Sequence, residues 1–305
     1  MTIENSVVVK NLSVQFDDFF AVKNISFNVK KGEIFGFLGA NGAGKTTTIK
    51  VLCGVQRPSS GEIIVNGESY GNVAALKSQI GYMSQKFTLY DDLTVYENLS
   101  FNSSLRKLDR AYFKSRVKEL LDFIEFDHSM ESLVADLPGG IKQQVSLVVS
   151  MLHDPEVIFL DEPTAGVTPY YRNKFWELIR MLSSKGKTIF VTTHYMDEAE
   201  YCDRIALMRT GEMIALDTPK NLKKNVFPEP LIEISVLDKS KVLIEKLQKD
   251  KNILSLLPFG SRYHLILKDL HSYHEFKQNY SDSFLIKEID PSLEDVFVRL
   301  VEGDR

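Results

Sequence analysis

Gly39-Ala40-Asn41-Gly42-Ala43-Gly44-Lys45-Thr46 is the stretch that decides how this chain folds. The apolar run 34–38 precedes it, and residues 47–52 follow without a helix breaker, which predicts a strand, a glycine-rich turn and a helix. The pattern G-x-x-x-x-G-K-[ST] in this setting is typical of a phosphate-binding loop. Its glycines let backbone N–H groups turn toward an anion, and the helix N-terminus adds the positive end of its dipole. We expect Lys45 to reach the β- and γ-phosphates and Thr46 to place its hydroxyl on Mg²⁺.

A second motif lies at the end of an apolar strand. Residues 157–160 are all apolar, as in the centre of a parallel sheet, and they deliver Asp161 and Glu162 to the carboxyl end of that strand. Downstream of a phosphate loop, Asp161 can hold Mg²⁺ through water, and Glu162 can orient and deprotonate an attacking water. The alternative is that Asp161 and Glu162 form only a solvated acidic turn. The apolar strand and the phosphate loop argue against it.

His194 follows the next predicted strand, residues 187–193. An isolated histidine is more often structural, but ligands of such sheets bind at the carboxyl ends of the strands. We therefore expect His194 to contact the γ-phosphate.

Composition narrows the class of protein. With 305 residues the chain exceeds one compact domain, which predicts a main domain and a smaller one. The net charge of -4 lacks the basic excess of nucleic-acid binders, and no apolar run approaches the ~18 residues that span a bilayer. No secretory signal is visible at the N-terminus. Cys53 and Cys202 stand alone, so we expect reduced, buried thiols of a cytosolic protein and no zinc site or disulfide.

The order of patterns predicts two domains, 1–225 and 226–305. In the first, an antiparallel pair of strands precedes the phosphate loop, and apolar residues at helical spacing predict a helical insertion over about 87–150. In the second, the order β-α-β-β-α-β predicts a small ferredoxin-like α+β sandwich with a helix over 241–248. A last helix is expected to begin at Ser292, with Asp295 as its capping partner.

These motifs, in this order, resemble the ATP-binding subunit of an ABC transporter over about residues 5–225. The resemblance implies an α/β P-loop NTPase of the ABC type, with a RecA-like core, an antiparallel subdomain and the helical insertion. It makes residues 39–46 the Walker A loop, 137–141 the signature, Asp161 and Glu162 the Walker B aspartate and catalytic glutamate, and His194 the switch histidine. Phe16 would stack on adenine, and Gln85 would touch Mg²⁺ and face the permease.

The resemblance also implies cofactors and a set of site residues. The cofactors are ATP and Mg²⁺, the catalytic residues are Glu162 and His194, and the metal residues are Thr46, Gln85 and Asp161. The residues expected to contact nucleotide are Phe16, Gly39, Asn41, Gly42, Ala43, Gly44, Lys45, Thr46, Thr47, Gln85, Pro138, Gly139 and Gly140.

Four segments, 81–85, 194–200, 203–205 and 291–297, resemble more narrowly the ATPase subunits of bacterial type-2 exporters, including drug exporters. That resemblance implies a Mg²⁺-dependent ATPase that powers export through a separate membrane permease, on the cytoplasmic face of the cell membrane. The implied assembly is a head-to-tail dimer, for which we favour two copies of this chain and no nucleic acid. Residues 85–93 and the helical insertion are expected to dock a permease loop.

Two places depart from the family pattern. In the signature, Pro138 stands where serine is usual and Ile141 where glutamine or methionine is commoner. Thr168 stands where the loop after Walker B normally has aspartate. One alternative is therefore a degenerate subunit that needs a different catalytic cassette, although the presence of Glu162 and His194 argues against it. Another is a soluble ABC ATPase acting on ribosomes or DNA, but its usual second cassette, coiled coils and zinc cysteines are missing here.

Overall fold

The computed structural model describes residues 4–86, 88–236, 244, 246–248 and 250–302. The chain divides into two compact units, Met1–Pro219 and Lys220–Arg305. This division lies a few residues before the predicted boundary at 225/226, so all of α8 (Pro219–Val226) except its first residue belongs to the second unit. There the guanidinium of Arg299 lies 4.9 Å from the ring centroid of Phe227 and forms an ion pair with Glu229.

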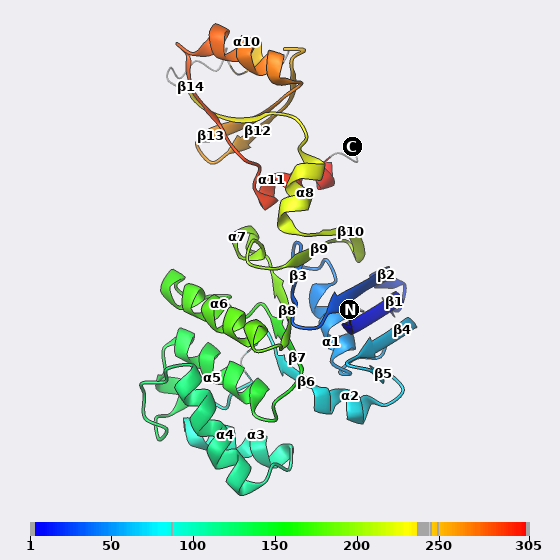
Figure 1. Cartoon of the computed structure of the whole chain (residues 1–305), viewed down its shortest axis with the longest axis vertical. Helices are drawn as coiled ribbons and strands as arrows, with labels where there is room; N and C mark the ends of the chain where they lie inside the picture. The colour runs from blue at the N-terminus through cyan, green and yellow to red at the C-terminus, as the bar shows by residue number, and fades with distance from the viewer. Residues whose placement is uncertain (1–3, 87, 237–243, 245, 249, 303–305) are drawn as a thin grey trace. The chain divides into compact units, whose positions relative to one another are not determined.

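The first unit is built on a six-stranded sheet in the order β10-β9-β3-β8-β7-β6 (Figure 1). These strands are β3 (Ile34–Leu38), β6 (Ile80–Met83), β7 (Val157–Asp161), β8 (Thr188–Thr193), β9 (Arg204–Arg209) and β10 (Glu212–Asp217). All the neighbours pair in parallel except β9 and β10. Every residue of β3, β7 and β8 is buried, as the continuous apolar runs predict for central parallel strands.

A second, antiparallel sheet has the order β2-β1-β4-β5, from β1 (Asn5–Phe16), β2 (Phe19–Lys30), β4 (Ser60–Val65) and β5 (Glu68–Ser69). Helix α1 (Lys45–Leu52) contacts both β2 and β7 and so joins the two sheets. Phenylalanine rings add to this junction: Phe27 of β2 stacks on Phe35 of β3 with centroids 5.6 Å apart. The phosphate loop is therefore held on both sides by buried apolar structure.

Helices make up the rest of the first unit. The predicted insertion contains α3 (Val95–Leu105), α4 (Arg110–Phe123), a 3-10 turn (Val134–Asp136) and α5 (Gly139–Met151). Outside it lie α2 (Val73–Gln79), α6 (Pro169–Ser184) and α7 (Met196–Ala199). Figure 1 shows α6 on the opposite side of the parallel sheet from α1. Among the residues described, no helix is both long and apolar enough to cross a membrane.

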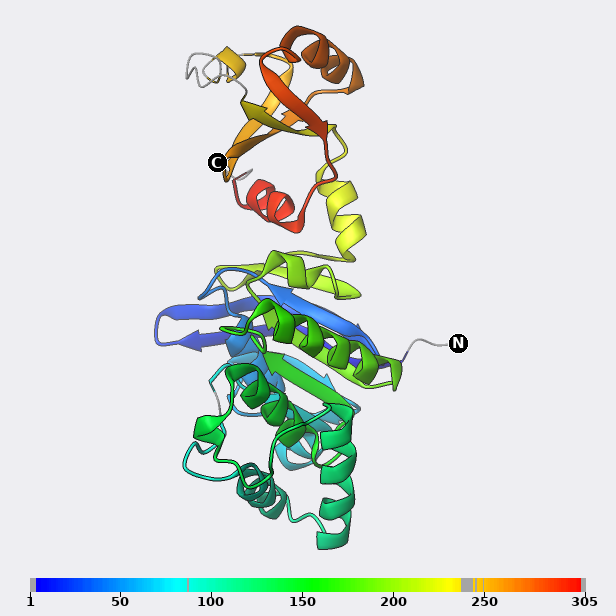
Figure 2. The same ribbon diagram turned by 90° about the vertical axis from the view of Figure 1, so that its left-hand side faces the viewer.

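The second unit is a four-stranded antiparallel sheet with the order β12-β13-β11-β14. Its elements are β11 (Leu231–Val236), β12 (Ile253–Phe259), β13 (Arg262–Leu267), α10 (Leu270–Tyr280), β14 (Phe284–Glu288) and α11 (Leu293–Glu302), all visible in Figure 2. Within this unit, the first strand along the chain, β11, lies between the third, β13, and the fourth, β14. This is the predicted ferredoxin-like arrangement. Half of the helix predicted over 241–248, residues 241–243 and 245, lies outside the described residues. The predicted cap of α11 is confirmed, because Ser292 and Asp295 exchange hydrogen bonds of 2.8 and 3.1 Å through their side chains and backbones.

Candidate nucleotide-binding and catalytic site

The phosphate loop turns sharply between β3 and α1, and two of its glycines have no room for a side chain. A Cβ at Gly39 would lie 2.4 Å from the carbonyl oxygen of Met208, and one at Gly44 would lie 2.5 Å from that of Ala21. Gly44 also has φ +105, a conformation that favours glycine. Strands β2 and β9 thus press the loop into the curve that directs its N–H groups inward.

Lys45, the first residue of α1, has a buried side chain that reaches back over the loop. Its ammonium donates to the carbonyl oxygens of Gly39 and Ala40, at 2.7 and 3.2 Å, and lies 3.7 Å from Oε1 of Glu162. Burial lowers the pKa of Lys45, while the carboxylates of Glu162 and Asp161 oppose that shift. The predicted phosphate ligand and the predicted base are therefore neighbours.

Asp161, at the end of β7, joins the loop to the neighbouring strand β8. Its Oδ1 accepts hydrogen bonds from the hydroxyls of Thr46, at 3.0 Å, and Thr192, at 2.6 Å. Its Oδ2 is buried and has no hydrogen-bond partner among the described residues. Burial raises the pKa of Asp161, and the two threonine hydroxyls counteract that rise. A buried oxygen without a partner, next to a threonine hydroxyl, fits a hard cation that prefers oxygen ligands.

Glu162 has φ +50, which is uncommon for any residue with a side chain. Its N–H donates to the hydroxyl of Thr192 at 2.9 Å, which helps hold this left-handed conformation. The amide of Gln85 donates to Oε2 of Glu162 at 2.9 Å, and Nδ1 of His194 lies 3.2 Å from the same oxygen. Residues from three separate segments therefore meet at one carboxylate.

A cavity of about 500 Å³ opens over this cluster. Its lining includes the predicted Phe16, Gln85 and Glu162 together with loop residues 41–47. Phe19 also lines it, and our sequence interpretation did not identify that residue. Phe16 and Phe19 are paired across the β1–β2 hairpin, and both rings are exposed. The aromatic residues on either side of the two aspartates were the signal that could have identified the pair.

Comparisons with known proteins place the chain in a family. Residues 22–165 match the ABC transporter family. The probable multidrug ABC transporter ATP-binding protein YbhF of Escherichia coli (strain K12) is 42% identical over 238 residues, which are 75% of this chain and 41% of that protein. The Nod factor export ATP-binding protein I of Rhizobium leguminosarum bv. viciae is 34% identical over 297 residues, 97% of this chain and 94% of that protein.

The chain belongs to the ABC transporter family. The solved structure of cbiO1 from Clostridium perfringens, part of the ABC transporter complex cbiONQ, has a similar fold, with a TM-score of 0.67 and 27% identity over 81% of this chain and 100% of that one. The predicted P-loop fold of the ABC type is therefore confirmed. The chain spans less than half the length of YbhF.

The signature of this ABC transporter chain does not line the nucleotide cavity. Pro138 precedes α5 as its N-cap, without a side-chain hydrogen bond, and both Pro138 and Gly139 are exposed. Gly140 is buried against the ring of Tyr171, so closely that a Cβ there would lie 2.2 Å from Cγ of the tyrosine. The first N–H groups of a helix have no partner within that helix, so α5 presents donors beside an exposed proline.

A buried carboxylate that the sequence interpretation did not identify contacts the segments that carry the predicted catalytic residues of this ABC transporter chain. Glu198 is 0% exposed and accepts hydrogen bonds from the hydroxyls of Thr164, at 2.5 Å, and Thr193, at 2.8 Å. Nε of Arg172 lies 3.3 Å from the same carboxylate. Thr164 is two residues after Glu162, and Thr193 immediately precedes His194. Glu198 therefore ties together the two segments that carry the predicted catalytic residues.

Proposed function

We propose that this chain is the ATP-binding and ATP-hydrolysing subunit of an ABC exporter and acts through a separate membrane permease. The observation that carries the proposal is the convergence of Gln85, Lys45 and His194 on Glu162, beside a phosphate loop. The relatives include a probable multidrug transporter protein and a Nod factor export protein, which supports export as the process. A peripheral position on the cytoplasmic face of the membrane follows from the same proposal.

Glu162 is the proposed general base. Its carboxylate is held between the Gln85 amide and the His194 ring, so it can accept a proton from a water placed next to the γ-phosphate. Lys45, released from the carbonyl oxygens of the loop, would bind the phosphates. Hydrolysis of this kind depends mainly on positioning and on charge stabilisation, which fits a site rich in oriented donors.

Thr46 and Asp161 are the residues that we propose hold Mg²⁺, with Gln85 beside them. The unpartnered Oδ2 of Asp161 and the adjacent Thr46 hydroxyl supply the oxygen chemistry that this ion prefers. When bound, Mg²⁺ neutralises the charge that develops on the phosphate oxygens. The Phe16 and Phe19 rings at the mouth of the cavity are the proposed platform for adenine.

The predicted permease contact rests on exposed apolar side chains that follow Gln85. Tyr90 and Phe101 form an edge-to-face pair with centroids 5.3 Å apart, and both are exposed, as is Leu105 at the end of α3. Leu105 also lines a cavity of about 560 Å³, together with Arg106 after α3, Val55 after α1 and Tyr82 of β6. Exposed aromatic and apolar groups suit a protein–protein contact.

The dimer is the part of the proposal for which Pro138 matters most. Because the signature does not line the nucleotide cavity within one chain, we propose that a second copy supplies it, head to tail. The rival function is a degenerate subunit that needs a different cassette, and the missing hydroxyl at Pro138 is the observation that favours it.

The proposed function has a direct test. The purified chain should hydrolyse ATP in Mg²⁺ and stop when EDTA removes the metal. A membrane protein should copurify with the tagged chain from detergent-solubilised membranes. A chain that binds ATP without turnover under every Mg²⁺ concentration, alone and with that membrane protein, would support the degenerate subunit instead.

A further inference from the structure

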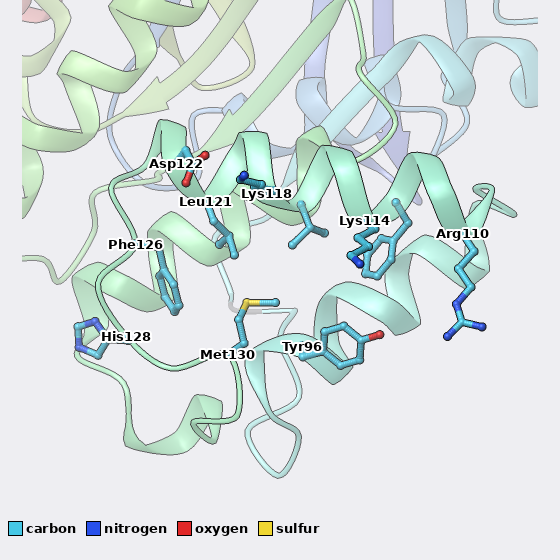
Figure 3. A pocket seen from close by; sticks show the side chains of 11 residues that line it. Tyr96, Arg110, Lys114, Lys118, Leu121, Asp122, Phe126, His128 and Met130 are labelled. Atoms are coloured by element: carbon cyan, nitrogen blue, oxygen red, sulfur yellow. The ribbon is translucent and has the colours of Figure 1, made fainter.

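A second cavity, of about 580 Å³, lies in the helical insertion and shares no lining residue with the nucleotide cavity. Figure 3 shows it as a groove bounded by one face of α4, by Tyr96 of α3 and by the segment 126–130. The proposed ATP hydrolysis uses none of these residues. The groove therefore needs an explanation of its own.

The walls of this groove are held by hydrogen bonds and by ring packing. The N–H of Tyr96 donates to the carbonyl oxygen of Met130 at 2.9 Å, and that of Phe126 donates to Leu121 at 3.0 Å. Tyr96 also packs edge-on against Phe113 of α4, with centroids 6.2 Å apart. A groove fixed in this way is preformed, so a ligand would not pay the entropy of ordering it.

Helix α4 presents two parallel rows to the groove. The apolar row is Phe113, Val117 and Leu121, and the basic row is Arg110, Lys114 and Lys118. Members of each row are four residues apart and so lie one above the other on the helix surface. The basic row extends over about 12 Å, since eight residues of helix rise about 1.5 Å each.

The three cations of the basic row are exposed, and none has an ion-pair partner among the described residues. Arg116 of the same helix differs, because it forms ion pairs with both Glu119 and Asp154. The basic row begins with Arg110, the first residue of α4, and the first turn of the helix has no acidic residue. Cations near a helix N-terminus oppose the helix dipole. The charge of Arg110 is therefore unfavourable to α4, and the exposed cations of the row are free to bind a partner.

We propose that this groove binds an acidic amphipathic α-helix of a second polypeptide. Apolar side chains of that helix would pack on Tyr96, Leu121 and Met130, above the buried Phe113 and Val117. Its carboxylates, one turn apart, would pair with the basic row. Figure 3 shows Arg110, Lys114 and Lys118 spread along α4 rather than directed at one point, which suits a row of charges better than a single anionic headgroup. Asp122 lies one turn after Lys118 on the same line of α4 and carries the opposite charge. The partner helix is therefore expected to have a basic residue one turn beyond its three carboxylates.

The test uses the full chain and a labelled probe peptide of about 16 residues. The probe has leucines along one face and, beside them, three glutamates and then one lysine at one-turn spacing. Its control exchanges the signs, with three lysines and one glutamate. Fluorescence anisotropy at low salt should give saturable binding of the probe and none of the control. Binding should weaken steeply as salt is raised, because the pairs are exposed.

The protein variants are matched in charge. Lys114→Glu with Lys118→Glu should weaken probe binding about tenfold or more, whereas Lys31→Glu with Lys268→Glu, at exposed lysines outside the groove, should leave it unchanged. Circular dichroism and ATP turnover should be the same in both variants, which separates a lost contact from unfolding and from a failure of the proposed ATPase function. Equal binding by both variants would overturn the proposal, as would no binding at all. Binding to phosphatidylglycerol vesicles through the same lysines, without peptide binding, would assign the basic row to a membrane surface instead and would also overturn it.

Discussion

The hydroxyl of Thr164 donates a 2.5 Å hydrogen bond to the fully buried carboxylate of Glu198, which does not line the nucleotide cavity. The same carboxylate accepts from Thr193, next to His194. A charged group that is buried persists only when its partners are well placed, and here the partners are the two segments that deliver Glu162 and His194. Glu198 is therefore a positioning residue in this structure.

Glu198→Gln should slow ATP turnover about tenfold, because it removes the charge that holds both segments. ATP affinity should change little, since Glu198 does not line the nucleotide cavity. Steady-state hydrolysis and nucleotide binding, measured on the same preparation, test whether turnover falls while ATP affinity is kept. Glu177→Gln, an exposed glutamate of α6, is the matched control. An equal loss of affinity and of turnover would indicate general destabilisation and not a positioning role.

Gln85→Ala should uncouple transport from hydrolysis more than it lowers ATP affinity. The amide of Gln85 donates to Glu162, and the exposed Tyr90 and Phe101 follow Gln85 in the chain. Gln85 therefore connects the proposed base with the segment proposed to contact the permease. The measurement is transport beside ATP turnover in vesicles that contain the chain and its permease. Normal transport per ATP hydrolysed would show that coupling does not pass through Gln85.

The Pro138→Ser variant tests whether the dimer contains two copies of this chain. In a homodimer both ATP sites would face Pro138 and lack a serine hydroxyl, a deficit of roughly 1–3 kcal/mol if a γ-phosphate oxygen is left unpaired. The N–H groups of Gly139 and Gly140 would still face the anion. We expect slow turnover that is second order in protein at low concentration, and faster turnover in Pro138→Ser. Activity that begins only when a different cassette protein is added would exclude the homodimer.

Much of this fold follows from the sequence because its signals are local. The phosphate loop, the apolar strand before Asp161 and the cap of α11 are each specified by a few adjacent residues. Strands β9 and β10 were not predicted, since β9 gains its burial from pairing with β3, far away in the chain. The same reason hides Glu198, because its role depends on Thr164, 34 residues away in the chain. Phe19 differs, since its partner Phe16 is close in sequence and the aromatic residues around the two aspartates could have identified it.

Acid should destabilise the protein partly through His153. Burial, reinforced by the nearby Arg106, lowers the pKa of His153 from 6.5 to about 4, and its Nε2 lies 2.8 Å from the carbonyl oxygen of Ile80. Between those two pH values the unfolded chain binds a proton that the folded chain does not. Stability from this group is therefore complete above pH 6.5 and is lost as the pH falls toward 4.

His153→Gln removes this titration but keeps a side chain that can donate. The fall in unfolding free energy between about pH 7 and pH 5 should be smaller in the variant than in the wild type, by about 1–2 kcal/mol. Urea unfolding at both pH values measures it, and His271→Gln, at an exposed histidine of α10, is the control. The same pH dependence in all three proteins would remove His153 from this role.

ATP turnover by Glu162→Gln in Mg²⁺, measured beside ATP binding by the same protein, is the most direct measurement on the proposed site. The side chain keeps its shape and can no longer accept a proton from water. Turnover should fall roughly 10²-fold or more, the usual scale for losing a positioned base, while ATP affinity stays close to that of the wild type. Glu177→Gln should behave as wild type. Near-normal turnover by Glu162→Gln would contradict the assignment of Glu162 as the base on which the other contacts of the site converge.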